Sequence, residues 1–256
     1  MIELQSKEYQ KVYEMVNLSA SNRVYPLSIV EGFQKGQIFV DSIENPTCAL
    51  IWHFCGFGYL EGEPKEDFLA ETAALIRNEK KTNPRRLVME IDHPQWETYF
   101  SSHPGISRKE RYSFIYTGTG RQQTSLPEGF TLKAIDANIL SRLKGRIIPS
   151  FSWDWDIDFL KKGKGFCLLY GQEIAATAFS SAVSHEEIDI GVETAEPFRN
   201  QGCAALVAQK MVQYVLDTGK RPVWECYTDN IGSRRTAERI GFVLEKKFSF
   251  FKVAGE

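Results

Sequence analysis

The sequence predicts an α/β protein in which two consecutive halves each form a mixed, mostly antiparallel central sheet flanked by helices. Of the 256 residues, 43% are hydrophobic, which is enough for one large core or two smaller ones. Segments with alternating apolar residues and segments with helical spacing follow one another along the chain, as expected for an α/β fold. The order of these segments in the first half recurs in the second half.

The second half contains the clearer pattern. A hairpin turn at Gly171-Gln172 separates its first two predicted strands. A helix begins at Gly202 with one apolar face and ends at Gly219, a typical C-cap. In order, we expect helices near 136–144 and 155–161, strands at 165–170, 173–181 and 187–194, the helix from 202, a strand at 223–227, a helix at 230–240 and a strand at 242–253.

The first half repeats this order of elements. Its patterns predict a helix at 7–16, strands at 37–41, 47–53 and 57–60, a helix at 65–80, a strand at 86–91, a helix at 94–102 and a strand at 111–117. Glycine and proline cluster between 118 and 129, which favours a boundary there. The predicted domains are therefore 1–126 and 127–256.

Composition excludes several functions. The formal net charge is −2 and no basic block occurs, which argues against nucleic acid as a partner. The apolar segments are too short for a membrane span, and the N-terminus lacks the pattern of a signal peptide. The five cysteines form no CxxC pair, which favours reduced thiols and a cytoplasmic location. The four histidines are scattered, so we expect no metal site.

The segment 199–204 has the form Arg-x-x-Gly-x-Ala between a predicted strand and a predicted helix. Small residues at Gly202 and Ala204 permit a ligand to approach the backbone closely. The first N–H groups of the helix and its positive dipole end point at the loop, a geometry that binds phosphate. The alternative is an ordinary junction of loop and helix. A thiol nucleophile at Cys203 is less plausible than apolar packing, because no histidine is nearby in sequence.

A second motif follows at the spacing Asn230, Ser233, Gly241 and Phe242. Together the two motifs resemble those of the GNAT superfamily of acyl-CoA-dependent N-acyltransferases, over about residues 127–256. The whole chain looks more loosely like the two-part branch that includes zwittermicin-A-resistance-type acetyltransferases. The resemblance implies tandem GNAT-like domains and acetyl-CoA (coenzyme A) as the acyl donor.

The resemblance also implies which residues hold the cofactor. In GNAT domains the fourth and fifth strands part, and the exposed edge of the fourth strand pairs with the pantetheine arm. The backbone amides of the loop hold the pyrophosphate, and the asparagine of the second motif lies near the pantetheine. The implied cofactor residues are Val192, Glu193, Thr194, Arg199, Asn200, Gln201, Gly202, Cys203, Ala204, Asn230 and Ser233.

The first half carries an acidic run, 61–67, at the corresponding loop position. Its four carboxylates oppose the binding of a pyrophosphate. We therefore interpret the first half as a degenerate GNAT-like domain without a cofactor loop. The alternative is an unrelated α/β domain, because the repeat is one of element order.

Acyl transfer to an amine needs a base, and two carboxylates are candidates. Glu193 lies on the predicted fourth strand and Glu225 on the fifth, on either side of the implied gap. The alternative for each is a structural or solvent-facing role. Many GNAT enzymes protonate the leaving sulfur with a tyrosine seven residues after the motif asparagine, but this chain has Ala237 there. Tyr227, or release of the thiolate without an acid, has to replace it.

The acceptor side is expected in the segment before the first hairpin of the second half. Trp153, Asp154, Trp155 and Asp156 occur together there, and they suit a cationic amine through cation–π contact and charge. The alternative is an acidic first turn of a helix, with tryptophan packed on the core.

The sequence thus favours an N-acetyltransferase that transfers an acetyl group from acetyl-CoA to a small amine, with the acidic segment favouring a cationic one. A non-catalytic acyl-CoA-binding module is the second interpretation, favoured by the alanine at position 237. Transfer of an aminoacyl group from tRNA is a third, and the lack of a basic patch argues against it.

Overall fold

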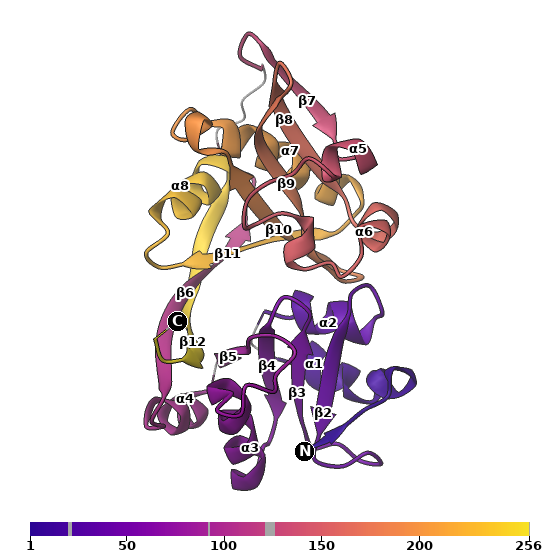
Figure 1. The fold of residues 1–256 in the computed structure, drawn as a ribbon, viewed down its shortest axis with the longest axis vertical. Coiled ribbons are helices and arrows are strands. Elements are labelled where there is room, and N and C mark those ends of the chain that lie inside the picture. Colours follow the sequence, from indigo (N-terminus) through magenta and orange to yellow (C-terminus); the bar gives the residue numbers. More distant parts are fainter. Residues whose placement is uncertain (20–21, 92, 121–125, 256) are drawn as a thin grey trace. The chain divides into compact units, whose positions relative to one another are not determined.

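The structure is a computed structural model that describes residues 1–255 except 20–21, 92 and 121–125. The chain forms two compact units, one of Met1–Arg111 with Lys247–Glu256 and the other of Tyr112–Lys246 (Figure 1). The predicted boundary at 126/127 falls inside the second unit. Part of the predicted linker, 121–125, lies outside the described residues.

Two long strands explain why the units do not follow the sequence boundary. The strands β6 (Ile106–Tyr116) and β12 (Phe242–Val253) are neighbours, and each contributes residues to both units. The last residues of the chain consequently belong to the first unit, where Phe250 is opposite Glu90 of β5 (Val88–Ile91). Pairing between segments so far apart in sequence leaves no local signal.

Unit 1 is a mixed sheet in the order β1-β2-β3-β4-β5-β12. The pairs β1–β2, β2–β3, β3–β4 and β5–β12 are antiparallel, and β4–β5 is parallel. The helix α3 (Glu66–Arg77) connects the two parallel strands and buries Phe68, Ala73 and Ile76 in the core of this unit. The remaining strands are β1 (Ile2–Glu3), β2 (Gly36–Val40), β3 (Cys48–His53) and β4 (Phe57–Gly62).

The smaller helices of unit 1 differ in part from the expected ones. The segment predicted as a helix at 7–16 is a 3-10 helix, η1 (Ser6–Val12), followed by α1 (Tyr13–Asn17). The sequence did not predict α2 (Val24–Val30), because all of its residues are buried and it has no amphipathic period. The predicted helix at 94–102 is present as α4 (Pro94–Ser101).

Unit 2 has a sheet in the order β6-β11-β10-β9-β8-β7. Its pairs β7–β8, β8–β9 and β9–β10 are antiparallel, whereas β10–β11 is parallel. The strands β8 and β10 have the predicted bounds. The sequence did not predict β7, a largely exposed edge strand without strong alternation. The strands are β7 (Phe130–Ala134), β8 (Gly165–Tyr170), β9 (Glu173–Val183), β10 (Glu187–Thr194) and β11 (Arg221–Tyr227).

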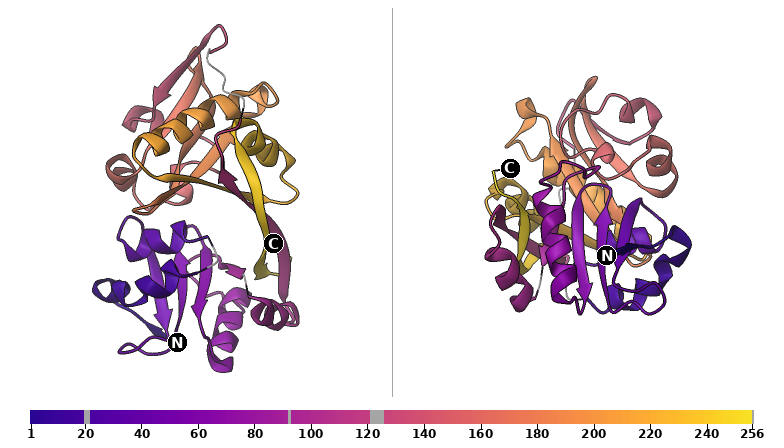
Figure 2. Two further views of the ribbon diagram at one scale, coloured as in Figure 1. Left: turned by 180° about the vertical axis from the view of Figure 1, so that it is seen from behind. Right: turned by 60° about the horizontal axis from the view of Figure 1, so that its bottom comes forward.

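Helices cover both faces of the sheet of unit 2 (Figures 1 and 2). On one face α7 (Cys203–Asp217) packs on β8, β9 and β10, with α8 (Ile231–Ile240) beside it. It buries Ala208, Met211, Val212 and Val215, the predicted apolar face. The segment with α5 (Ala137–Leu140), η2 (Pro149–Phe151) and α6 (Asp156–Lys162) lies on the other face. A short turn, η3 (Glu196–Phe198), precedes α7.

The two units share the order of their elements. The first half contains the order β2-β3-β4-α3-β5-α4-β6, and the second half contains β8-β9-β10-α7-β11-α8-β12. In each unit three antiparallel strands are followed by a helix and a parallel strand. The predicted fold class, an α/β fold with a mixed sheet flanked by helices, is confirmed.

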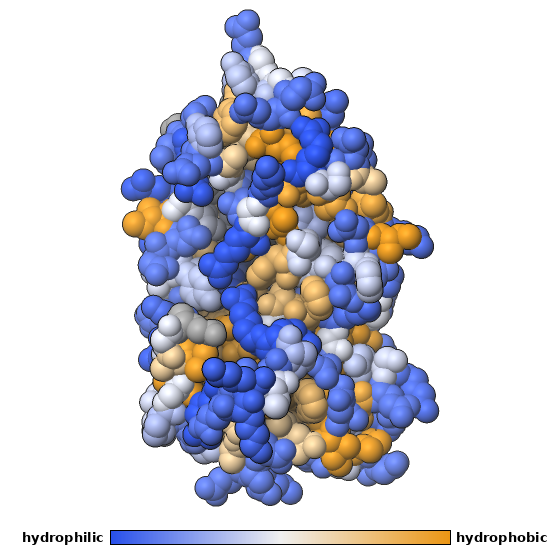
Figure 3. Space-filling model, in the orientation of Figure 1, coloured by the Kyte–Doolittle hydropathy of each residue, from blue (hydrophilic) through white to orange (hydrophobic). Residues whose placement is uncertain are grey.

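The visible surface of each unit mixes hydrophilic side chains with smaller apolar patches (Figure 3). Within the described residues, every helix is too short or too polar to cross a lipid bilayer.

Candidate active site

The strands β10 and β11 part after a short parallel contact. Their paired residues run only from Glu187 opposite Arg221 to Asp189 opposite Val223. Beyond this point β10 continues along β9 alone, with Glu193 opposite Thr177. The parting leaves one edge of β10 with backbone groups that no strand satisfies, and such an edge can pair with an extended ligand.

An irregularity in β9 accompanies the parting. The register between β10 and β9 shifts after Asp189, which is opposite Ala182, whereas Ile190 is opposite Ser180. Ser181 is therefore the additional residue of a β-bulge. Bulges bend a strand and increase its twist, so the shift accounts for the departure of β10 from β11 at the same residue.

The loop between β10 and α7 presents backbone donors. Asn200 and Gly202 are both in the left-handed region, with φ of 61° and 81°. Within the described chain, no acceptor bonds the N–H groups of residues 200–202, and the first helical bond runs from Leu206 N to Gly202 O at 3.2 Å. The N–H groups of the loop and of the first turn of α7 therefore gather at a helix N-terminus, an arrangement that binds anions.

Two arginines flank this loop. Arg199 donates through Nε to the carbonyl of Thr194 at 3.4 Å, which ties the loop to the end of β10. Arg239 of α8 lies over Gly202, because a Cβ built there would stand 3.3 Å from an Nη atom of Arg239. Nothing in the local sequence marks Arg239 as a site residue, because only the packing of α8 brings its last turn to the loop. The loop, the helix dipole and Arg239 together fit a pyrophosphate.

Gln201 and Cys203 serve the loop itself. The side-chain amide of Gln201 donates to the carbonyl of Pro197 at 2.8 Å. Cys203 is 2% exposed, and burial raises the pKa of its thiol, which keeps the thiol protonated. These observations favour the packing role of Cys203 over that of a nucleophile.

Asn230 and Ser233 fix the start of α8. Asn230 is the N-cap, and its Oδ1 accepts a hydrogen bond from Ser233 N at 3.1 Å. The hydroxyl of Ser233 accepts a hydrogen bond from Trp224 Nε1 at 3.1 Å. The second motif therefore docks α8 on β11, in the position that brings Arg239 to the loop at Gly202.

The carboxylate of Glu193 supports a neighbouring segment. Its Oε2 accepts hydrogen bonds from Ile147 N at 2.9 Å and Arg146 N at 3.3 Å. A Cβ on Gly191 would stand 3.3 Å from a methyl of Ile147, so this segment lies on the Gly191 and Glu193 face of the sheet. The structural alternative for Glu193 thus has direct support.

Glu225 and Tyr227 lie on the part of β11 that has left β10. Both are half-buried and alternate with Trp224 and Cys226, which are buried on the other side. Alternation places them on the face of Val223, and hence of its neighbour Asp189. The Oε1 atom of Glu225 is fully buried. These two side chains stand beside the gap between the strands.

The predicted acceptor segment divides into buried and exposed parts. Trp153 is 3% exposed, donates to the carbonyl of Ser180 at 2.8 Å and contacts the ring of Phe159. The core-packing alternative is therefore favoured for Trp153. Trp155 is 60% exposed at the N-cap of α6, Asp156 is in the first turn of that helix, and Asp154 is half-buried.

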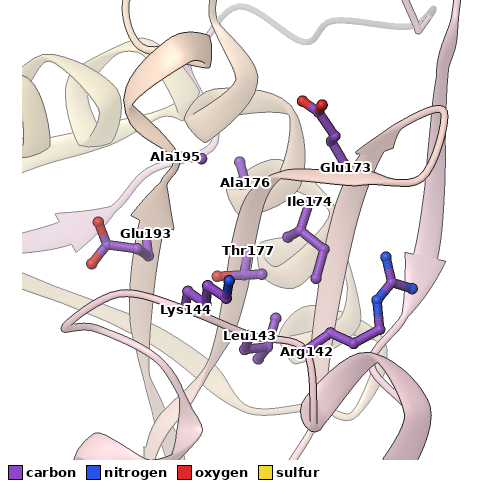
Figure 4. Close-up of a pocket in the computed structure, with 9 residues that line it drawn as sticks. All are labelled: Arg142, Leu143, Lys144, Glu173, Ile174, Ala176, Thr177, Glu193 and Ala195. Atoms are coloured by element: carbon purple, nitrogen blue, oxygen red, sulfur yellow. The ribbon is translucent and has the colours of Figure 1, made fainter.

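A pocket of about 260 Å³ lies on the Glu193 face of unit 2 (Figure 4). The sequence analysis named only Glu193 among its residues, because the others come from a loop and a neighbouring strand without a motif. It is lined by Arg142, Leu143, Lys144, Glu173, Ile174, Ala176, Thr177, Glu193 and Ala195. The described residues contain no group of three side chains that could hold a metal ion.

Comparison with known proteins places this geometry in a family. Residues 18–251 match the profile of the GNAT acetyltransferase family. An uncharacterized N-acetyltransferase of Bacillus subtilis (strain 168), YdfB, is 22% identical over 254 residues, which cover 97% of each chain. The structural relatives support the same fold over the full length.

A GCN5-related N-acetyltransferase-like protein from Streptococcus suis 89/1591 has a TM-score of 0.74 and 22% identity, over 97% of this chain and 99% of that one. A tandem GNAT protein from the clavulanic acid biosynthesis pathway has a TM-score of 0.68 and 11% identity, over 100% and 98% of the chains. The family match covers most of the sequence, and both structures share its two-unit fold. The chain therefore belongs to the GNAT acetyltransferase family and is an acyltransferase.

Proposed function

We propose that this acyltransferase uses acetyl-CoA and acetylates a small amine, in a site built on the gap between β10 and β11. The observation that carries the proposal is the coincidence of three features: an unpaired strand edge, a loop of free amides and a helix N-terminus. The predicted membership of the two-part branch that resembles zwittermicin-A-resistance-type acetyltransferases remains part of the proposal.

The cofactor residues are proposed on this geometry. The edge of β10 from Val192 to Thr194 holds the pantetheine arm, and the amides of 199–204 hold the pyrophosphate with Arg239 as a counter-ion. Asn230 and Ser233 act through the docking of α8. Acetyl-CoA supplies the acetyl group as a thioester, whose carbonyl carbon bonds to the amine nitrogen while the C–S bond breaks and the thiolate takes up a proton.

Glu225 is the preferred base in this proposal. Its carboxyl is half-buried beside the gap, whereas one oxygen of Glu193 is already bonded to two backbone amides. Glu225 accepts the proton of the attacking amine, directly or through water, and Glu193 is the second candidate. Tyr227 is two residues further along β11 on the same face. It is proposed to protonate the sulfur, because the position where many GNAT enzymes have a tyrosine is Ala237 in this chain.

The test combines binding and turnover. Release of free thiol from acetyl-CoA is measured with a panel of primary amines, and binding of CoA is measured by calorimetry. We expect saturable binding at one site and thiol release with at least one amine. A protein that binds no CoA would refute the cofactor assignment, and CoA binding without thiol release for any amine would refute the acceptor class.

Arg239 offers a specific check of the phosphate site. Loss of one charged hydrogen bond weakens binding by about 1.5–3 kcal/mol, so Arg239→Gln should reduce CoA affinity about tenfold or more. Arg235→Gln, an exposed arginine of the same helix, is the matched control. Equal affinities of the two variants would remove Arg239 from the site.

A further inference from the structure

The pocket on the Glu193 face carries both signs of charge. Two cationic side chains, Arg142 and Lys144, come from the segment that follows α5, and two carboxylates, Glu173 and Glu193, come from β9 and β10. Figure 4 shows Glu193 on the left, Arg142 on the right, Lys144 between them and Glu173 at the top. The walls therefore present positive and negative groups at separate places.

These charges are not paired with each other. Across the described residues, no ion pair includes any of the four side chains. Arg142 donates to the carbonyl of Gln172, and Glu193 accepts from two backbone amides through one oxygen. Arg142 and Glu193 are thus held in place by backbone contacts, and their charges are available to a ligand.

The pocket adjoins the proposed acyl site. Glu193 and Ala195 belong to the end of β10 and to the start of the phosphate loop, and Thr177 is opposite Glu193 on β9. The acidic segment around Trp155 does not line the pocket. A volume of about 260 Å³ is small compared with the roughly 300–1,000 Å³ of pockets for drug-sized ligands. An occupant of amino-acid size fits this space.

We infer that the acceptor is a small zwitterion, an amine that also carries a carboxylate, and that this pocket selects it. The inference rests on the proposed acetyl transfer and specifies its substrate class. Arg142 and Lys144 hold the carboxylate, and Glu193 attracts the ammonium group, which becomes the attacking amine once its proton has left. The apolar side chains Leu143 and Ile174 surround the carbon skeleton.

The experiment compares matched acceptors. A panel of α-, β- and γ-amino acids is assayed for thiol release from acetyl-CoA, each beside the amine in which hydrogen replaces the carboxylate and beside the corresponding amide. We expect the amino acid to have at least tenfold higher kcat/KM than its two partners without a carboxylate, the effect of one charged hydrogen bond. Equal rates for the acid, the amine and the amide would overturn the inference while leaving the proposed acetyl transfer intact.

Variants then test the pocket residues. Arg142→Gln and Lys144→Gln should each raise KM for the preferred amino acid about tenfold, with kcat and CoA affinity nearly unchanged. Lys133→Gln, the same change on the exposed strand β7, is the control. A loss of CoA affinity in calorimetry would assign the cations to the cofactor phosphates and overturn the inference. Unchanged KM in both variants would do the same.

Discussion

The two units share the same order of strands and helices but differ in charge at the start of one helix, α3 in unit 1 and α7 in unit 2. In each, a helix connects two parallel strands that part beyond a short contact: β4 and β5 pair as far as Tyr59 and Glu90, and β10 and β11 as far as Asp189 and Val223. The helix that follows begins differently. At α7 a left-handed Gly202 precedes the first turn and Arg239 lies over it, whereas α3 begins with Glu66 and Asp67.

This difference teaches that the fold alone does not make an anion site. A helix N-terminus attracts negative charge, and carboxylates in the first turn already satisfy that preference. The carboxylates of α3 also repel a phosphate. In unit 2 the amides of residues 200–202 and the guanidinium of Arg239 carry positive charge or partial charge at the corresponding place. The architecture is common to both units, and the side chains at the start of α3 and α7 are where the two units differ in charge.

The largest effect is expected from Gly202→Val. A β-branched side chain is strained at φ of 81° and would press against the guanidinium of Arg239, so the loop would lose several charged hydrogen bonds. CoA affinity, measured by calorimetry, should fall by more than about 100-fold. Gly219→Val is the matched control, because Gly219 has φ of 73° with open space around its Cβ position. Similar affinity in the two variants would place the phosphate site elsewhere.

Glu225→Gln should remove the proposed base of unit 2 and keep the proposed cofactor site. Turnover of an accepted amine should fall about 100-fold, the contribution typical of general base catalysis, while CoA affinity stays within about twofold. Glu186→Gln makes the same change at an exposed position outside the gap, and its turnover should match that of the original chain. If Glu193→Gln, and not Glu225→Gln, loses turnover, the order of the two candidate bases is reversed.

Unit 1 should be the more acid-sensitive unit because of His53. This histidine is fully buried, and desolvation lowers its pKa from 6.5 to about 3. Between pH 6.5 and pH 3 the histidine is protonated in the unfolded chain and neutral in the folded chain. Protonation therefore favours the unfolded chain, and the free energy of unfolding decreases as the pH falls from 6.5 towards 3.

Urea unfolding between pH 7 and pH 5 measures this effect. The free energy of unfolding should fall by up to about 1.4 kcal/mol per pH unit in the lower part of the range, and His53→Gln should show a flatter dependence. Fluorescence of Trp52 in β3 reports on unit 1 and that of Trp224 in β11 on unit 2. If the free energy of unfolding of His53→Gln depends on pH as steeply as that of the unmodified chain, other titratable groups control the loss of stability in acid.

The smallest effect is expected from changes to α3. If unit 1 holds no cofactor, Glu66→Gln with Asp67→Asn should leave CoA stoichiometry near one per chain and the affinity within about twofold. The variant removes the charges that distinguish α3 from α7 and so tests whether these charges alone exclude a second site. A CoA stoichiometry near two in the unmodified chain would contradict the interpretation of unit 1 as a domain without a cofactor loop. A stoichiometry near two in the variant alone would show that the charges of Glu66 and Asp67 are what prevents binding in unit 1.

The sequence anticipated the elements whose signals are local. The strands β8 and β10 have the bounds that the sequence predicted, and the turn at Gly171 marked the end of β8. The apolar face of α7 was equally visible, whereas the N-cap role of Asn230 was not predicted. The helix expected at 136–144 is shorter, because α5 ends at Leu140 and the following segment instead bonds to Glu193.

Other features had no local signal. The helix α2 is buried on all sides, so its hydrophobicity has no period. The exchange of β6 and β12 between the units joins segments more than a hundred residues apart, and the boundary at 126/127 could not anticipate it. Trp153 was a substrate candidate, but only its burial and its bond to Ser180 reveal a core residue.

By itself, the sequence determined the fold class and the repeated order of elements, and it predicted the position of a phosphate-binding loop. These follow from periodicity, from glycine at a left-handed position and from spaced motifs, which act over a few residues. The tertiary structure decided which groups lie close together. It places Arg239 over Gly202, bonds Glu193 to the backbone of 146–147, and brings Arg142 and Lys144 to the pocket on the Glu193 face. Such meetings depend on the packing of α8 and of the segment after α5 on the sheet, and side chains brought together by packing leave no pattern in the order of residues.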